Sequence, residues 1–145
     1  MPLVDITAPA GSIAPDRLEG LQQQVADTVL QWMELPLTDF FRSATWVYVH
    51  EAPEKTSATG AAATAPGFIV KVTALEDFLT PERTEQLSVE LTRLIQSTAT
   101  PATEAESTVW VIVHEIPEGN WSVNGNLTRR AKIDELIAQS APAAS

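Results

Sequence analysis

The chain contains two histidines, and each stands in a nine-residue segment that occurs twice. Residues 46–54 have the sequence WVYVHEAPE and residues 110–118 have the sequence WVIVHEIPE, so seven of the nine positions match. Histidine exchanges protons near neutral pH, which makes His50 and His114 candidates for acid–base chemistry. The repetition itself indicates a fused duplication of one small unit.

Composition excludes several kinds of site. There is no cysteine, and the histidines form no HxH or HExxH pattern, so we expect no metal site. The formal net charge of −10 argues against nucleic acid as a partner, because phosphate binding requires clustered cations. No apolar run approaches the ~18 residues of a membrane span. No secretory signal pattern is present, and we expect a cytoplasmic protein.

The first copy, residues 1–54, is expected to form a β-α-β unit. Alternating apolar and polar residues predict strands at 3–7 and 45–51. Between them, leucine and valine recur at helical spacing after Pro15, which predicts a helix to about Met33.

The second copy, residues 67–128, repeats this plan. Strands are expected at 68–73 and 109–114, and between them a helix with Thr80 as its N-cap. The turn-rich residues 118–126 predict a short hairpin.

Two further segments complete the chain, which we expect to be a single domain over residues 1–145. Residues 55–66 lack large apolar side chains and are interpreted as the linker between the copies. Residues 129–145 are expected to form a helix at about 129–139 and a frayed tail.

Together these elements predict an α/β (α+β) fold, in which tandem β-α-β repeats form a four-stranded mixed sheet with two helices on one face. If the strand valines face the helices, the opposite sheet face presents large apolar side chains, namely Trp46, Tyr48, Trp110 and Ile112. A face of this kind is normally buried in an oligomer, so the pattern predicts self-association.

Three sequence features resemble the tautomerase superfamily, which includes 4-oxalocrotonate tautomerase, malonate semialdehyde decarboxylase, the chloroacrylic acid dehalogenases and macrophage migration inhibitory factor. These are the start Met-Pro-Leu-Val, the Trp-Val-x-Val-His-Glu strand and the stretch GNWSVNG at 119–125. The resemblance implies a tautomerase-like fold and a homotrimer of fused chains that imitates a hexamer. It also implies a small carboxylic or 2-oxo acid as substrate.

In this family the catalytic group is the amine of an amino-terminal proline, which corresponds to Pro2. Removal of Met1 would leave a secondary amine, and an apolar pocket would lower its pKa by disfavouring the charged form. The expected activity is a cofactor-independent tautomerase or isomerase, with Pro2 as general base on a 2-oxo acid, an enol or an unsaturated acid. If the pKa of the Pro2 amine stays high, Pro2 would instead be the general acid of a hydratase, decarboxylase or dehalogenase.

A second catalytic candidate is Asp39, in the sequence Leu-Pro-Leu-Thr-Asp. This sequence resembles the Pro-x-x-Asp element of the decarboxylase branch, whose carboxylate positions water. The alternative is an ordinary aspartate in a turn before a strand.

Substrate-binding arginines of the family are not found at matching positions, since Trp46 and Trp110 occupy the second-strand position. Arg42, Arg129 or Arg130 would have to supply the charge from elsewhere, or each is a solvated surface arginine. A non-catalytic assembly or binding protein that kept the fold therefore remains an alternative.

The tryptophans are the remaining site candidates. Trp121 matches the hairpin aromatic that lines the family's pocket, while Trp46 and Trp110 either bind substrate or belong to an oligomer interface. Before the second strand of each copy the repeat has an offset of 66 residues, with residues 3–7 matching 69–73, so Pro2 matches Phe68, which has no free amine. Because both copies carry the His-Glu pair and only one has the proline, a structural role for the histidines is favoured and one site per chain is expected.

Overall fold

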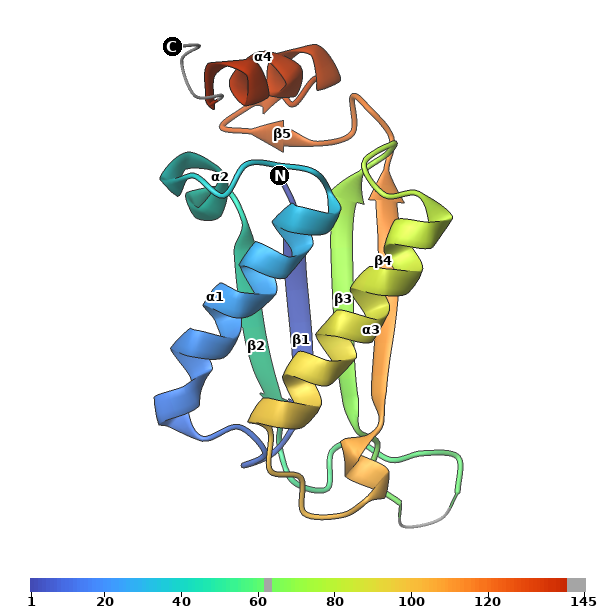
Figure 1. Cartoon of the computed structure of the whole chain (residues 1–145). Helices are drawn as coiled ribbons and strands as arrows, with labels where there is room; N and C mark the ends of the chain where they lie inside the picture. The colour runs from blue at the N-terminus through green and yellow to red at the C-terminus, as the bar shows by residue number, and fades with distance from the viewer. Residues whose placement is uncertain (62–63, 141–145) are drawn as a thin grey trace.

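Two β-α-β units lie side by side in one mixed sheet, with a hairpin and a further helix at one end (Figure 1). The structure is a computed structural model that describes residues 1–61 and 64–140. The main elements are β1 (Leu3–Pro9), α1 (Pro15–Trp32), α2 (Asp39–Ser43), β2 (Trp46–Ala52), β3 (Phe68–Leu75), α3 (Pro81–Thr98), η1 (Ala105–Ser107) and β4 (Val109–Ile116).

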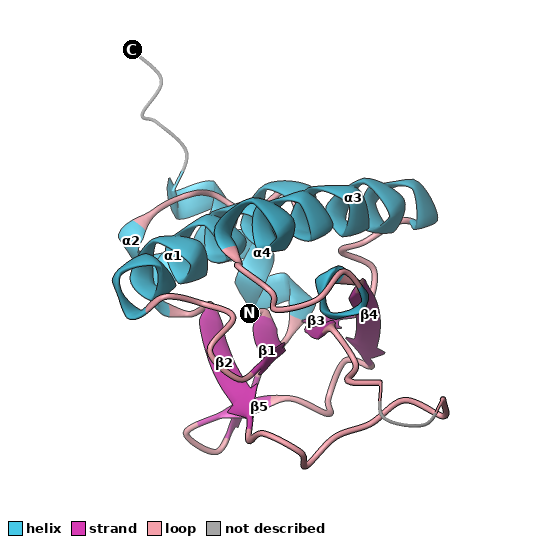
Figure 2. Ribbon diagram, turned by 90° about the horizontal axis from the view of Figure 1, so that it is seen from below, coloured by secondary structure: helices cyan, strands magenta, loops and turns pink. Residues whose placement is uncertain are grey.

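The strand order is β2-β1-β3-β4, which confirms the predicted four-stranded mixed sheet. Each crossover helix makes its two strands parallel, so β1 pairs with β2 and β3 with β4 in parallel, whereas the central pair β1 and β3 is antiparallel. Helices α1 and α3 cover one face of the sheet (Figure 2).

Alternation along the central strands separates core from solvent. Val4, Ile6 and Ala8 of β1 are buried against the helices, as are Val70 and Val72 of β3. The opposite face exposes the large side chains predicted for it: Trp46 at 61%, Tyr48 at 49%, Trp110 at 64% and Ile112 at 43%.

Helix boundaries follow local capping chemistry. Helix α1 ends in a Schellman motif, in which Glu34 adopts φ 57° and the Leu35 amide donates to the Leu30 carbonyl at 2.9 Å. The helix therefore ends at Trp32, one residue before the predicted end at about Met33. Helix α3 begins as predicted, because the Thr80 hydroxyl accepts a hydrogen bond from the Arg83 amide at 3.2 Å.

The duplication is visible as an approximate twofold relation between the halves. Asp5 and Lys71 are equivalent under the 66-residue offset, and they are direct cross-strand partners in the antiparallel pair β1–β3. The pseudo-twofold axis therefore passes between them. The Asp5 carboxylate also lies 3.8 Å from Nε2 of His50 on the neighbouring strand.

Beyond β4 the chain departs from this symmetry. Strands β5 (Ser122–Val123) and β6 (Asn126–Leu127) form the predicted hairpin, whose turn residues Asn124 and Gly125 have φ of 51° and 83°. Positive φ at both positions is what a two-residue Asn-Gly hairpin turn requires. Helix α4 (Arg130–Ser140) follows and is anchored in the core by Ile133, which is 1% exposed.

Two sequence predictions stay predictions. The boundaries of the single domain, of its two units and of the linker 55–66 stay predictions, and the tail at residues 141–145 lies outside the described part of the chain.

Within the described residues, no helix combines the length and apolarity that crossing a bilayer requires.

Candidate active site

The amino terminus lies at the end of the sheet where the hairpin crosses (Figure 1), and Pro2 directly precedes β1 there. Pro2 is buried, and its carbonyl accepts a hydrogen bond from the Trp46 amide at 3.3 Å, which fixes it against the start of β2. A cavity of about 610 Å³ opens beside it. The cavity is lined by residues 1–3, Phe40, Ser43, Ala44, Trp46 and residues 121–124.

Three separate parts of the chain therefore form the walls. Helix α2 contributes Phe40, the beginning of β2 contributes Trp46, and the hairpin contributes Trp121. The Trp121 carbonyl accepts a hydrogen bond from the Thr128 amide at 2.8 Å, which closes the base of the hairpin. A cavity of this size suits a small organic molecule.

The cavity is apolar enough to change the acidity of an amine. Burial lowers the pKa of the Met1 α-ammonium from its ordinary 8.0 to about 6. The cause is desolvation, because a partly buried ammonium loses hydration that the neutral amine does not need. Pro2, which follows it, is buried.

Asp39, the second catalytic candidate, is not brought into the cavity. It is the exposed first residue of α2, and Phe40, the next residue, lines the wall instead. The Thr38 hydroxyl caps this helix by accepting from the Phe41 amide at 3.3 Å. Helix α2 was not predicted, and with it sequence reasoning missed Phe40 and Ser43. The Thr38-Asp39 cap sequence was the available signal.

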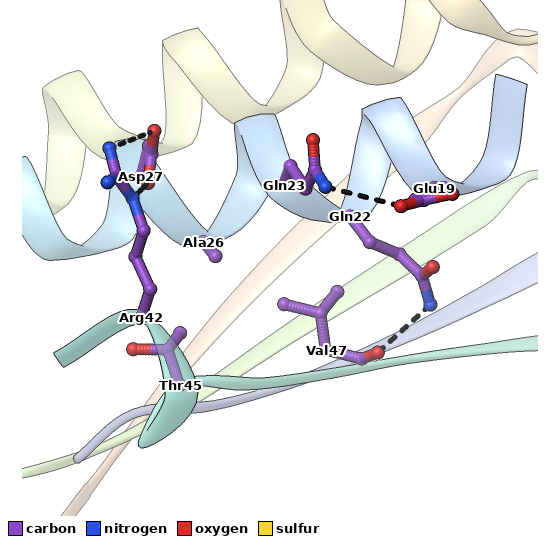
Figure 3. Close-up of a pocket in the computed structure, with 8 residues that line it drawn as sticks. All are labelled: Glu19, Gln22, Gln23, Ala26, Asp27, Arg42, Thr45 and Val47. Atoms are coloured by element: carbon purple, nitrogen blue, oxygen red, sulfur yellow. Dashed lines mark hydrogen bonds and ion pairs between the residues drawn. The ribbon is translucent and has the colours of Figure 1, made fainter. Parts of the chain in front are cut away.

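Arg42 lies in a different cleft, between α1 and β2 (Figure 3). Its Nε donates to Asp27 Oδ1 at 2.9 Å and its Nη2 donates to Oδ2 at 3.2 Å. This hydrogen bonding with Asp27, together with its charge, raises the pKa of the Arg42 guanidinium. Gln22 lines the same cleft and donates to the Val47 carbonyl at 3.1 Å. The structure thus places Arg42 away from Pro2.

Arg129 and Arg130, at the start of α4, also lie outside the cavity wall. Arg129 lies close to Gly119, since a Cβ at that glycine would be 3.6 Å from Arg129 Nη1. Arg130 stacks over the Phe78 ring at 4.1 Å and pairs with Asp134 at 3.1 Å. Of these two, Arg129 was the binding candidate, and that role stays a prediction.

Trp110 lies at the opposite end of the sheet. It pairs with Ile69 on β3, whose cross-strand partner on β1 is Thr7, whereas Pro2 precedes the other end of β1. The equivalent of Pro2 at that far end is Phe68, which is 2% exposed and whose nitrogen donates to the Thr108 carbonyl at 2.8 Å. Only Trp121 and Trp46 among the predicted tryptophans are therefore gathered around Pro2.

The histidines are also outside the cavity. His50 stacks on Tyr48 with ring centroids 5.9 Å apart, on the exposed sheet face, and His114 occupies the equivalent position on β4. Among residues 1–61 and 64–140, no three His, Cys, Asp or Glu side chains gather in a way that could hold a metal ion.

The arrangement of the whole chain can be compared with known proteins. No family model and no curated protein matches the sequence. Solved structures do match it. The structure of Pt0534 inactivated by 2-oxo-3-pentynoate has a TM-score of 0.71 at 23% identity, over 90% of this chain and 98% of that one.

Two other structures cover nearly the whole fold. A fused 4-OT symmetric trimer has a TM-score of 0.68 at 17% identity, over 87% of this chain and 94% of that one. N1, a member of the cis-3-chloroacrylic acid dehalogenase family, has a TM-score of 0.69 at 17% identity, over 97% of this chain and 92% of that one. The chain has the tautomerase fold. The fold expected from the Met-Pro start, the repeated strand and the hairpin is thereby confirmed.

Proposed function

We propose that the chain, once Met1 is removed, is a cofactor-independent tautomerase whose Pro2 amine is the general base. The observation that carries the proposal is the position of Pro2, buried beside a cavity of about 610 Å³ with Trp121 in its wall. The tautomerase fold supports it.

The chemistry requires an uncharged amine at neutral pH. Burial already lowers the pKa of the Met1 amine to about 6, so the cavity favours the neutral form of an amine at this place. Such an amine takes a proton from the carbon next to a carbonyl group and leaves an enolate. The resulting ammonium then returns a proton to the oxygen or to the far carbon of the conjugated system, which completes the isomerisation.

The expected substrates are small 2-oxo acids, their enols or unsaturated acids. A hydratase- or decarboxylase-type role, with Pro2 as acid and Asp39 positioning water, has less support, because Asp39 is exposed and outside the cavity wall. The lowered pKa of the neighbouring amine likewise favours a base over an acid.

We further propose that the chain assembles as a homotrimer with one proline site per chain. The support is the exposed sheet face with Trp46, Tyr48, Trp110 and Ile112, which is too apolar to remain in water. Sedimentation velocity of the native chain and of Tyr48→Lys tests this, and a native chain that sediments as a monomer would contradict it.

The catalytic proposal is tested in two steps. Intact-mass measurement first establishes that Met1 is removed, since retention would turn the Pro2 nitrogen into an amide without a basic lone pair. Deuterium exchange next to the carbonyl of 2-oxo acids is then followed for the native chain, for Pro2→Ala and for Pro9→Ala as a control at the other end of β1. We expect Pro2→Ala alone to lose most of the exchange. Equal rates in all three proteins would sink the proposal.

A further inference from the structure

The wall of the Pro2 cavity is uncharged. Among the described residues, the lining side chains are apolar or aromatic apart from Ser43, Ser122 and Asn124, and none of them carries a formal charge. The Ser43 hydroxyl is already donated to the Phe40 carbonyl at 2.8 Å. The remaining polar side chains, Ser122 and Asn124, are neutral donors, and no cationic side chain among the described residues stands beside them in the wall.

Two of the arginines in the surrounding elements are held elsewhere. Arg42 forms its bidentate pair with Asp27 in the other cleft (Figure 3), and Arg130 stacks on Phe78 and pairs with Asp134. Turning Arg42 towards Pro2 would break two charge-assisted hydrogen bonds.

A carboxylate would be poorly bound in such a place. Moving an ionised group out of water is costly unless a cation or several donors replace its hydration. The net charge of −10 also slows the approach of an anion. Apolar and aromatic surface does the opposite for a neutral ring, because burying it against Phe40, Trp46 and Trp121 is favourable.

We propose that the Pro2 cavity selects an uncharged aromatic carbonyl compound, a ketone, aldehyde or ester with an enolisable carbon, over the corresponding carboxylic acid. The inference rests on the proposed function and narrows its substrate class away from the acids expected by resemblance. The ring lies between the indoles of Trp46 and Trp121, and the carbonyl oxygen accepts from Ser122 or Asn124.

A matched pair of probes tests this selectivity. 4-Phenylbutan-2-one and 2-oxo-4-phenylbutanoate share the same ring and chain. The ketone has a methyl group where the acid has its carboxylate. Titration of the native chain is followed by NMR on the Trp121 indole N–H, which places the ligand in the cavity. We expect the ketone to bind about tenfold more tightly than the acid, on the scale set by the cost of burying an unpaired charge.

A charge placed in the wall should reverse the preference. Val123 is exposed and lines the cavity, so Val123→Arg supplies the absent cation, and acid affinity should rise about tenfold. Val89→Arg is the matched control, because Val89 is an exposed valine on α3 in a separate cleft. An acid that binds the native chain as tightly as the ketone overturns the inference, and so does an equal response of the two variants.

Binding and turnover separate this inference from the proposed function. Selective binding of the ketone without deuterium exchange next to its carbonyl would leave the selectivity intact and remove the catalytic role of Pro2. If the acid instead binds more tightly than the ketone and exchanges rapidly, the catalytic role of Pro2 stands and the selectivity is overturned.

Discussion

Replacing Trp121 with alanine should raise the pKa of the terminal amine at the Pro2 cavity. Desolvation alone lowers the pKa of the Met1 amine from 8.0 to about 6. Trp121 is half-buried and forms the hairpin wall of the cavity, so its removal admits water to the amine. A hydrated ammonium is stabilised, and the pKa therefore returns towards its ordinary value.

The size of the effect follows from the two limits for the Met1 amine. At pH 7 an amine of pKa about 6 is roughly nine-tenths unprotonated, whereas one of pKa 8.0 is roughly one-tenth unprotonated. Full hydration would thus remove up to about nine-tenths of the free base. The same direction applies to Pro2 after Met1 removal. The loss of rate at pH 7 should be recovered at about pH 9, where the amine is neutral in either case.

The assay combines two measurements on the same protein. Chemical shifts of Pro2 in proline-labelled chain report the titration directly, and the pH dependence of deuterium exchange reports the base during turnover. Trp110→Ala is the control, because it removes an exposed indole at the far end of the sheet. If Trp121→Ala titrates like the native chain, or if Trp110→Ala shifts the amine equally, burial by the hairpin is not what tunes it.

Three stability predictions follow from the packing. In urea unfolding, Gly67→Ala should lower the free energy of unfolding by at least about 2 kcal/mol, because a Cβ there overlaps a backbone carbonyl oxygen. Gly20→Ala should raise it by about 0.5–1 kcal/mol, because Gly20 lies on α1 with open space around it. Ile133→Ala should lower the free energy of unfolding by about 2–5 kcal/mol, because it leaves a cavity in the core. Val89→Ala should change it by no more than about 0.5 kcal/mol, because Val89 is 57% exposed. Finally, in a chain that retains Met1, the lowered amine pKa means that the unfolded state binds more protons between pH 6 and 8. The free energy of unfolding should therefore rise with pH across that window, by at most about 2–3 kcal/mol, and an acetylated amino terminus should abolish this rise.

The regular elements could be predicted because their signals are local and repeated. Alternation along β1 and β3, proline at the start of α1 and α3, and the Thr80 cap each specify an element without reference to the rest of the chain. The Asn-Gly turn of the hairpin is of the same kind. Comparing the two copies added what a single unit lacks, namely the equivalence of Pro2 and Phe68.

The walls of the cavity could not be predicted, because they depend on where chain segments meet. Helix α2 has five residues, too few for a hydrophobic period, so Phe40 and Ser43 had no recognisable place in the sequence. Arg42 was a binding candidate by its charge, yet α2 directs it towards Asp27 on α1. Which side of a short helix faces the amine is decided by tertiary packing.

The two copies have become dependent on each other at the candidate site. The first copy supplies Pro2, Phe40 and Trp46, while the hairpin with Trp121 follows the last strand of the second copy. At the far end the equivalent of Pro2 is Phe68, whose nitrogen is an amide within the chain and is hydrogen-bonded to a carbonyl. Under the proposed function, the base therefore forms at one end only. A single copy would hold the amine without the wall that desolvates it, or the wall without the amine. Under this view the duplication built one site from two halves, and substitutions in either copy should change the pKa of the same amine.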